Sequence, residues 1–160
     1  MTWLYNDNPL DENELEGYTS FVYLITNLVN GKRYIGKKLL QFKKTRQVKG
    51  KKIKFLTDSD WREYWGSNKV LQEEVTTMGS DYFKREILRM CKSKGEASYW
   101  EAKLQFQYDV LLNDSFYNDH IMVRVHRKHL IKKEKTDALG SQKQFGKRSK
   151  KDRKLEEKKA

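Results

Sequence analysis

The sequence contains a single cysteine, Cys91, among its 160 residues. One thiol excludes an internal disulfide framework and a zinc site built from cysteines, since both need several thiols. No apolar run approaches the roughly 18 to 20 residues of a membrane-spanning helix, and the N-terminus lacks the basic start and apolar core of a signal peptide. We therefore expect a protein that has no membrane partner and works in a reducing cytoplasm.

Acidic residues are missing from residues 37–54, where the chain instead carries nine Lys and Arg side chains. The whole chain has a formal net charge of +12. Such an excess favours a polyanionic partner; the plain alternatives are a basic ribosome-associated protein or a charge that only keeps the protein soluble. Clusters of cations bind phosphate backbones in a salt-dependent, sequence-independent manner. We expect this segment to contact nucleic acid.

The distribution of charge divides the chain into three parts. Residues 1–17 carry five acidic side chains and no basic one, and we expect an acidic arm that Trp3 pins to the domain. A solvated extension is favoured over an arm that guards the basic surface electrostatically. Residues 18–131 hold the material for one domain with a modest core. Residues 132–160 predict a basic tail, helical or disordered, that binds phosphates without specificity.

A β-hairpin is predicted for residues 21–38, because two runs of strand formers flank a turn-rich segment. If Asn27–Asn30 forms a four-residue loop, Tyr23 lies opposite Tyr34 with Cβ atoms roughly 5 Å apart. If Asn30-Gly31 is a two-residue turn, the tyrosines still share a face but are offset by four positions. We favour the wider loop, in which two neighbouring phenols bracket one oxygen-rich substrate.

Further elements follow the hairpin. Residues 37–54 fit either a helix followed by a loop or a second hairpin that turns at Gly50, and both arrangements would hold their cations near the tyrosines. A short helix is predicted over 69–77, and a third strand over 82–90 has apolar contacts from Phe83, Ile87 and Leu88. A long helix begins at a capping box formed by Ser93 and Glu96 and runs to about Leu112. A last strand or extended segment follows over 121–125.

One carboxylate on the long predicted helix falls at the edge of an apolar stripe. The stripe consists of Ala97, Trp100, Leu104, Tyr108 and Leu111 at helical spacing. Glu101 is the only charged residue inside the same arc. A carboxylate at a core-facing edge must be paired, protonated or bound to a metal ion; the alternative is a marginal glutamate that reaches water. Glu101 is therefore a candidate metal ligand.

Two halves of a known motif lie on the predicted hairpin. Val22-Tyr23 and, ten residues later, Arg33-Tyr34-Ile35-Gly36 resemble the GIY-YIG motif of a nuclease family that cuts phosphodiester bonds. The second half matches letter for letter, whereas Phe21 and Val22 stand where the family has glycine and isoleucine. The resemblance extends to about Asn118. It implies an α/β (α+β) fold with a small, mainly antiparallel three-stranded sheet flanked by helices.

The resemblance also implies an activity. It identifies the chain as a metal-dependent DNA endonuclease, of the phage homing type because of the basic insertion and the stretch from Tyr64 to Asn68. A phage-encoded protein would act in the cytoplasm of the host cell, and we favour a monomer. The chain carries no recognisable zinc finger or helix-turn-helix, which leaves its sequence specificity open. The alternative is a noncatalytic nucleic-acid-binding protein on the same scaffold.

Catalytic roles follow from the resemblance residue by residue. Tyr23 would act as the general base or orient the attacking water, with Tyr34 beside it. Lys37 and Lys38, directly after the motif, would depress the tyrosine pKa and hold the scissile phosphate. Glu101 would bind a single Mg²⁺ or Mn²⁺ ion, which prefers oxygen ligands. That ion would stabilise the leaving oxygen.

The family also places an arginine on the first helix after the motif. Arg62 is the preferred candidate because its planar guanidinium suits a phosphate, while Arg46 is nearer in sequence to the family's position. Tyr64 would take the part of a histidine or tyrosine that family members often carry four residues after this arginine. Asn118 would support the site from behind the groups that touch the substrate.

Overall fold

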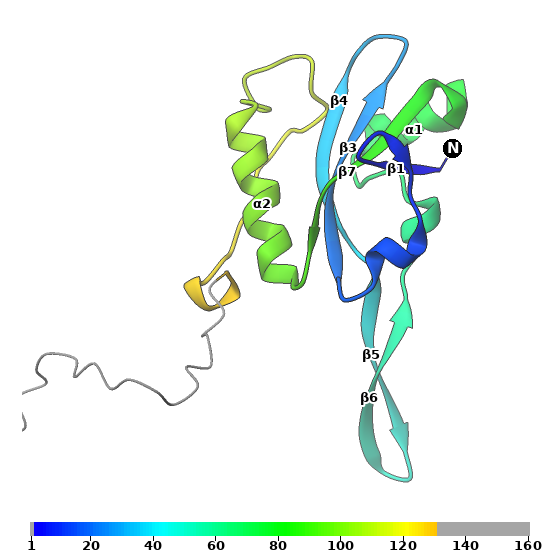
Figure 1. Cartoon of the computed structure of the whole chain (residues 1–160), viewed down its shortest axis with the longest axis vertical. Coiled ribbons are helices and arrows are strands. Elements are labelled where there is room, and N and C mark those ends of the chain that lie inside the picture. Colours follow the sequence, from blue (N-terminus) through cyan, green and yellow to red (C-terminus); the bar gives the residue numbers. More distant parts are fainter. Residues whose placement is uncertain (1, 131–160) are drawn as a thin grey trace, which may run out of the picture.

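The computed structural model describes residues 2–130, which form a five-stranded sheet flanked by helices and a separate two-stranded ribbon (Figure 1). The expected basic tail, residues 132–160, lies outside the described residues. The strands are β1 (Trp3–Tyr5), β2 (Asn8–Pro9), β3 (Ser20–Asn27), β4 (Arg33–Leu39), β5 (Gln41–Val48), β6 (Lys51–Asp58) and β7 (Phe83–Cys91). The helices are α1 (Lys69–Met78) and α2 (Lys94–Gln107), with short 3-10 turns η1 (Glu12–Leu15), η2 (Trp61–Glu63), η3 (Ser80–Tyr82) and η4 (Arg127–His129). Within this part of the chain, no helix is long and apolar enough to cross a membrane.

The sheet has the strand order β2-β1-β7-β3-β4. Its centre, β7-β3-β4, is antiparallel as predicted. The prediction of three strands is wrong, because β1 adds to β7 in parallel and β2 pairs with β1. Trp3 explains this attachment. Its side chain is buried, packs edge-on against Phe21 and Tyr23, and donates a hydrogen bond from Nε1 to the carbonyl of Trp61 at 2.9 Å. The expected acidic arm therefore supplies two strands of the sheet.

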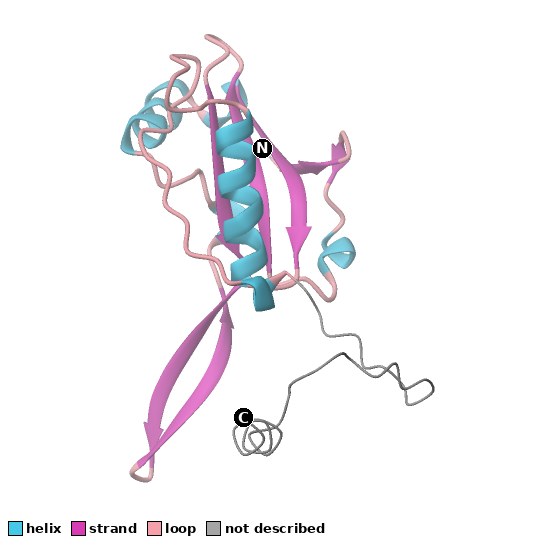
Figure 2. Cartoon of the chain, turned by 90° about the vertical axis from the view of Figure 1, so that its left-hand side faces the viewer, coloured by secondary structure: helices cyan, strands magenta, loops and turns pink. Residues whose placement is uncertain are grey.

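Both faces of the sheet are covered. Helix α2 lies across one face, against Val22 and Ile35 (Figure 2). The other face of β3 presents Phe21, Tyr23 and Ile25 to a second apolar cluster, to which the N-terminal arm, η2 and α1 contribute. Successive side chains of a strand alternate between faces, so a strand that is buried on both sides is apolar at nearly every position, as β3 is.

The register of β3 and β4 differs from the predicted one by two residues. Tyr23 pairs with Gly36, whereas the favoured loop placed Tyr23 opposite Tyr34. The loop closes later than expected, because the backbone N–H of Asn27 donates to the carbonyl of Lys32 at 2.8 Å. The two tyrosines still share a face, as predicted, and their ring centroids are 6.1 Å apart.

Residues 41–58 form a second hairpin, which was one of the two predicted arrangements. Strands β5 and β6 turn at Lys49 and Gly50, whose φ angles of 48° and 78° suit a tight two-residue turn. The hairpin projects from the domain (Figure 1). The expectation that this segment holds its cations near the tyrosines is therefore wrong for the hairpin, and only Lys37 and Lys38 on β4 remain at the sheet.

The predicted short helix and third strand are both present, as α1 and β7. The side chain of Asn68 accepts a backbone hydrogen bond at the start of α1, and Gly79, with a φ of 98°, follows its last residue. Leu88 was expected to make apolar contacts. Instead it is the extra residue of a β-bulge opposite Val22 and Tyr23, and 39% of it is exposed.

Helix α2 is shorter than predicted and presents a different face to the sheet. It ends at Gln107 and not near Leu112. Its buried residues are Ala97, Ser98, Ala102 and Gln105. Two members of the predicted stripe, Tyr108 and Leu111, are exposed. Small side chains let the helix approach the sheet closely, so the large ones are displaced to its margins. Glu101 consequently lies within the buried face and not at its edge.

The segment after α2 returns along the edge of β4. A parallel bridge joins Arg33 to Phe116. Tyr117 anchors the segment, because its hydroxyl donates to Glu74 of α1 and accepts from the side-chain amide of Asn27. Residues 121–125 form no strand, so the first of the two predicted forms, a last strand, is wrong.

Candidate active site

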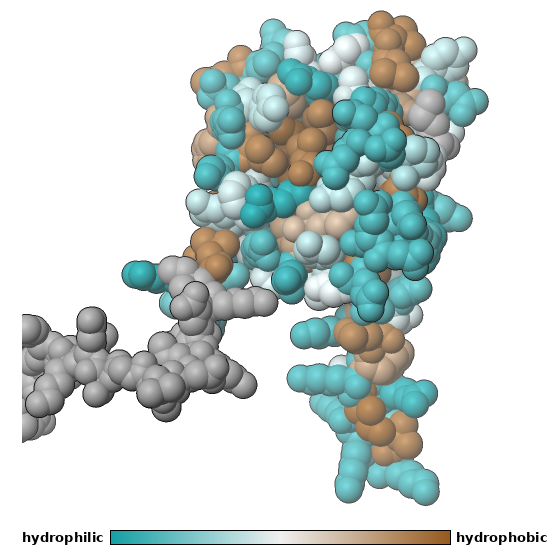
Figure 3. Space-filling view, in the orientation of Figure 1, coloured by the Kyte–Doolittle hydropathy of each residue, from teal (hydrophilic) through white to brown (hydrophobic). Residues whose placement is uncertain are grey.

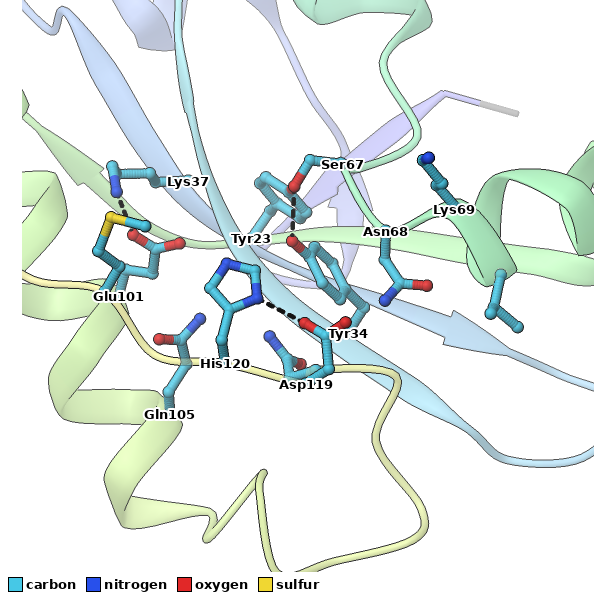
Figure 4. A pocket seen from close by; sticks show the side chains of 13 residues that line it. Tyr23, Tyr34, Lys37, Ser67, Asn68, Lys69, Glu101, Gln105, Asp119 and His120 are labelled. Carbon is cyan, nitrogen blue, oxygen red and sulfur yellow. Dashed lines mark hydrogen bonds and ion pairs between the residues drawn. The ribbon is translucent and has the colours of Figure 1, made fainter.

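A pocket of about 550 Å³ opens around β4, the last strand of the sheet. It is lined by Tyr23, Tyr34, Lys37, Ser67, Asn68, Lys69, Val70, Glu101, Gln105, Asn118, Asp119, His120 and Met122 (Figure 4). Because β4 is the edge strand of the sheet within residues 2–130, groups from both faces of the sheet reach the pocket. The tyrosines come from one face, and Glu101 comes from α2 on the other.

The pocket unites most of the residues that the sequence singled out. Those that line it are Tyr23, Tyr34, Lys37, Glu101 and Asn118. Those that do not line it are Lys38, Arg46, Arg62 and Tyr64. The expected pair of phenols, the lone carboxylate and one cation therefore come together, while the two candidate arginines remain outside.

The ring of Tyr23 lies directly over Gly36. A Cβ atom at position 36 would stand 2.4 Å from the hydroxyl oxygen of Tyr23 and 2.9 Å from a ring carbon of Tyr34. This close approach is the physical reason for the glycine that ends the second half of the motif. Gly66 also lies near the Tyr34 ring, with 3.3 Å between its would-be Cβ and that ring. The Tyr34 hydroxyl is then held by a hydrogen bond of 2.9 Å to Ser67.

Burial keeps both phenols protonated. Desolvation raises the pKa of Tyr23 well above its ordinary value of 10.0. It also raises the pKa of Tyr34, although the hydrogen bond to Ser67 offsets part of that shift. The expectation that Lys37 and Lys38 depress the tyrosine pKa is wrong, because both ammonium groups are paired with carboxylates. At neutral pH the two hydroxyls act as uncharged hydrogen-bonding groups.

Lys38 and Tyr64 lie behind Tyr23 and not in the pocket. The ammonium of Lys38 is 2.6 Å from a carboxylate oxygen of Asp60 and 3.7 Å from the centroid of the Tyr64 ring. Tyr64 packs edge-on against Tyr23, with 6.0 Å between the ring centroids. These contacts shield Tyr23 from water on its inner side, and so they contribute to its raised pKa.

Glu101 points into the pocket and is ion-paired with Lys37 (Figure 4). Only 13% of the Glu101 side chain is exposed, against 27% for Lys37. Burial raises the pKa of Glu101 above its ordinary value, and the hydrogen bond and charge of Lys37 offset part of this shift. Of the three predicted states of this carboxylate, paired, protonated or bound to a metal ion, the structure shows the paired one, with a partner from β4.

Asn118 fastens the last segment of the pocket to β4. Its side chain accepts from the N–H of Ile35 at 3.0 Å and donates to the carbonyl of Ile35 at 2.8 Å, as a strand partner would. Gln105, which the sequence analysis did not single out, donates to the same carbonyl at 3.0 Å. Asn118 therefore acts by holding its neighbours Asp119 and His120 over the pocket.

Three titratable residues of the pocket were missed by the sequence analysis. Lys69 is the first residue of α1 and follows its cap, Asn68. His120 and Asp119 follow Asn118, with 2.5 Å between Nδ1 of the histidine and a carboxylate oxygen. The position of Asp119 and His120 in the sequence could have indicated them, since they directly follow Asn118, which was predicted to support the site. Within residues 2–130, no three His, Cys, Asp and Glu side chains stand close enough together to hold a metal ion.

Neither candidate arginine reaches the pocket. Arg62 lies on η2, where two of its nitrogens donate to the carboxylate of Glu12 at 2.8 Å each. Arg46 lies on β5 of the projecting hairpin. Among the residues that line the pocket, the permanent cations are Lys37 and Lys69.

The fold and this constellation define a nuclease scaffold, and comparison with known proteins gives its family. Residues 3–121 match the family described as "Putative endonuclease segE, GIY-YIG domain", so the chain belongs to the GIY-YIG endonuclease family. The match includes β1 and ends just after His120. The chain is 32% identical over 98 residues to "Putative endonuclease segE" of Enterobacteria phage T4, an alignment that covers 61% of this chain and 39% of that protein. The chain thus spans well under two thirds of that relative's length. No solved structure matches the chain.

The contact between Tyr23 and Gly36 can be tested by Gly36→Ala. We expect a loss of about 2 to 3 kcal/mol in the free energy of unfolding, because the added methyl group overpacks a buried site. Gly31→Ala is the control, since its φ is 74° but no atom lies within 4 Å of its would-be Cβ; strain of the left-handed backbone alone should cost about 1 kcal/mol there. Urea denaturation measures both. A Gly36→Ala variant as stable as the unmodified protein would contradict the close approach.

Proposed function

We propose that this chain hydrolyses phosphodiester bonds of DNA as a metal-dependent endonuclease of the homing type. The observation that carries the proposal is the meeting of Tyr23, Tyr34, Lys37 and Glu101 in one pocket. Phosphodiester hydrolysis needs a positioned water, relief of charge at phosphorus and help for the leaving oxygen. The net charge of +12 and the likeness to a phage protein that is named "Putative endonuclease segE" support DNA as the substrate.

The two phenols position the attacking water and a phosphate oxygen. Their raised pKa values leave them uncharged, so each offers one hydroxyl donor and two acceptor lone pairs. Tyr34 is oriented by Ser67, and Tyr23 by the rings packed around it. Because the phenol of Tyr23 is too weak a base at neutral pH, the proton of the water must pass to another group.

His120 is the group that we assign to this proton. It lines the pocket, and its Nδ1 is engaged by Asp119, which leaves Nε2 to exchange a proton (Figure 4). Histidine is the side chain that changes charge near neutral pH. Asn118 fixes the segment on which it lies.

The scissile phosphate is held by the two lysines of the pocket. Lys69 begins α1, where the first backbone N–H groups of the helix also favour an anion. Lys37 is ion-paired with Glu101 and can exchange this carboxylate for a phosphate oxygen. Together they supply the positive charge that the family draws from an arginine.

Glu101 is the residue that would hold the divalent ion, Mg²⁺ or Mn²⁺. Asp119 lines the same pocket and offers a second carboxylate. This donor set fits Mg²⁺, which is commonly held by one or two carboxylates together with waters and substrate phosphates. When bound, such an ion supplies charge stabilisation to the leaving oxygen.

The rival function is a noncatalytic DNA-binding protein on the same scaffold. Two observations favour it. Neither Arg46 nor Arg62 reaches the pocket, and a fully buried Phe21 stands where the family's motif begins with glycine.

Supercoiled plasmid separates the two functions. We expect the protein to cut the plasmid with Mg²⁺ and not with EDTA. Glu101→Gln should lower the rate about a hundredfold or more, because one charge-stabilising group is lost, while the affinity for DNA changes less than about threefold. Glu96→Gln, on the same helix but outside the pocket, is the matched control and should cut at the unmodified rate. Binding without cutting would select the rival, and an active Glu101→Gln would remove Glu101 from the metal site.

Replacement of His120 tests the proton acceptor. His120→Ala should lower the single-turnover cutting rate about 10² to 10⁴-fold, the usual contribution of general acid–base catalysis, without weakening DNA binding. His126→Ala is the control, because His126 caps η4 and does not line the pocket. A rate within threefold of the unmodified protein would assign the proton to a different group.

Replacement of Lys69 tests the phosphate contact. Lys69→Met should lower kcat/KM about a hundredfold, as expected when a donor to the developing charge is removed. Lys94→Met is matched to it, since Lys94 is the first residue of α2 but lies outside the pocket. Equal effects of the two substitutions would show that Lys69 contributes only general positive charge.

A further inference from the structure

The proposed function does not use the projecting hairpin, residues 41–58, which we call the ribbon. Strands β5 and β6 pair only with each other, through eight residues on each strand. The ribbon extends away from the domain in both views (Figures 1 and 2). All of its strand residues except Thr57 are exposed. An isolated two-stranded hairpin is marginally stable in water unless another strand, helix or molecule covers one of its faces. A ribbon of this length is therefore expected to bind a partner.

The charge of the ribbon points to a polyanion. Seven Lys and Arg side chains lie between Lys43 and Lys54, and Asp58 at its base is the one acidic residue. None of the seven is ion-paired with a carboxylate of the described residues. Their mutual repulsion is relieved when phosphates replace the missing counter-charge.

The two faces of the ribbon differ. The register places Arg46 opposite Ile53 and Lys44 opposite Phe55, which defines a face that we call the arginine face. Its apolar members are Phe42, Val48, Ile53 and Phe55, each between 37% and 42% exposed. Its basic members are Lys44, Arg46 and Lys51. The opposite face, which we call the lysine face, has three lysines, Lys43, Lys52 and Lys54, with polar residues and a single apolar one, Leu56, which is 58% exposed.

Apolar side chains that stand in water beside cations mark the arginine face as the contact face. Figure 3 shows hydrophobic residues at the surface of the ribbon between hydrophilic side chains. An exposed apolar strip is an aggregation hazard unless a partner covers it. Double-stranded DNA can contact both the apolar and the basic side chains of this face. Thymine methyl groups lie on the floor of the major groove, and phosphates line its walls.

The ribbon is held firmly to the strand that carries the pocket. β4 runs on into β5 after one residue, Leu40, whose N–H donates to the carbonyl of Thr19 at 3.0 Å. On the returning side, the N–H of Ser59 donates to Leu40 at 2.9 Å and its hydroxyl to Leu39 at 2.5 Å. The ribbon is thus fixed at both of its strands, and its direction is set by the sheet.

This attachment fixes how far the ribbon reaches. Lys37 in the pocket and Lys49 at the tip are twelve residues apart, which is at most about 40 Å of extended chain at about 3.3 Å per residue. One turn of B-DNA spans about 34 to 36 Å. A duplex held in the pocket therefore presents its next stretch of groove within reach of the ribbon.

We propose that the ribbon is a DNA-binding arm that enters the major groove with its arginine face toward the bases, about one helical turn from the phosphate in the pocket. The major groove is about 12 Å wide and admits a two-stranded β-ribbon. The major groove of A-form RNA is too narrow for side chains to read, so the proposal is specific to DNA. The position relative to the pocket rests on the proposed function, whereas the groove contact does not.

Binding of the full chain to a 40-base-pair duplex, measured in EDTA, tests the arm without cleavage. One triple variant removes three charges from the arginine face: Lys44→Gln, Arg46→Gln and Lys51→Gln. The matched control removes three charges from the lysine face: Lys43→Gln, Lys52→Gln and Lys54→Gln. The first triple should weaken binding at least tenfold at 0.1 M salt and lower the slope of log K against log salt by about two to three. The control should weaken it less than threefold.

Groove ligands and RNA provide the second readout. Methyl green, which occupies the major groove, should compete with the unmodified protein but not with the arginine-face triple. Distamycin, which occupies the minor groove, should compete with neither. Double-stranded RNA of the same sequence should bind at least tenfold more weakly than DNA.

Several outcomes would overturn the proposal. Equal losses for the two triples would mean diffuse charge and no contact face, and unchanged binding would mean that the ribbon touches no DNA. Self-association that the arginine-face triple abolishes would assign this face to a second copy of the chain. Competition by distamycin alone would place the contact in the minor groove. A protein that fails to cut plasmid yet shows the expected binding differences would retain the arm and lose the proposed nuclease function.

Discussion

The passage of the Tyr23 ring over Gly36 is the contact on which the rest of the site depends. It holds only because position 36 has no side chain, and it accompanies a register in which Tyr23 pairs with Gly36 and the Tyr34 ring lies beside the Tyr23 ring. Side chains from both faces of the sheet reach one pocket because β4 is the last strand of the sheet. A larger residue at position 36 would collide with the rings of both tyrosines.

The electrostatics of the pocket arise from burial more than from nearby charge. Desolvation holds the protons on Tyr23 and Tyr34 and raises the pKa of Glu101, against which Lys37 is the counter-charge. Phenols in such surroundings are suited to hold and orient the attacking water and a phosphate oxygen. The transfer of the proton is better assigned to His120, which also lines the pocket. The pairing of Lys37 with Glu101 also keeps a carboxylate ionised in a place where an unpaired one would tend to bind a proton.

Elements whose apolar residues follow a clear strand or helix period could be predicted from the sequence. Strand register, strand attachment and the buried face of α2 could not, because a few local contacts determine them. The shared face of the tyrosines follows from alternation along strands, but their stagger depends on Asn27, which closes the loop later than expected. A three-residue β1 is too short to be recognised, and its attachment depends on one buried indole, that of Trp3. The predicted apolar stripe of α2 includes large side chains such as Trp100 and Tyr108, whereas Ala97, Ser98, Ala102 and Gln105 are buried, which places Glu101 within the buried face and not at its edge. Arg46 is the candidate nearer to the family's position in the sequence, and the insertion of β5 and β6 makes that distance a poor guide.

The parallel pairing of β1 with β7 constrains the order in which the chain can fold. Trp3 lies beside Arg85 in the register, so β1, although it pairs locally with β2, must wait for some eighty further residues before it can pair with β7. Contacts this remote in sequence form slowly, since loop closure must precede any gain from them. Helix α2 and the residues that complete the pocket emerge later still. A ribosome-bound fragment is therefore unable to assemble the constellation around Gly36, which comes into being only after nearly the whole domain has been made.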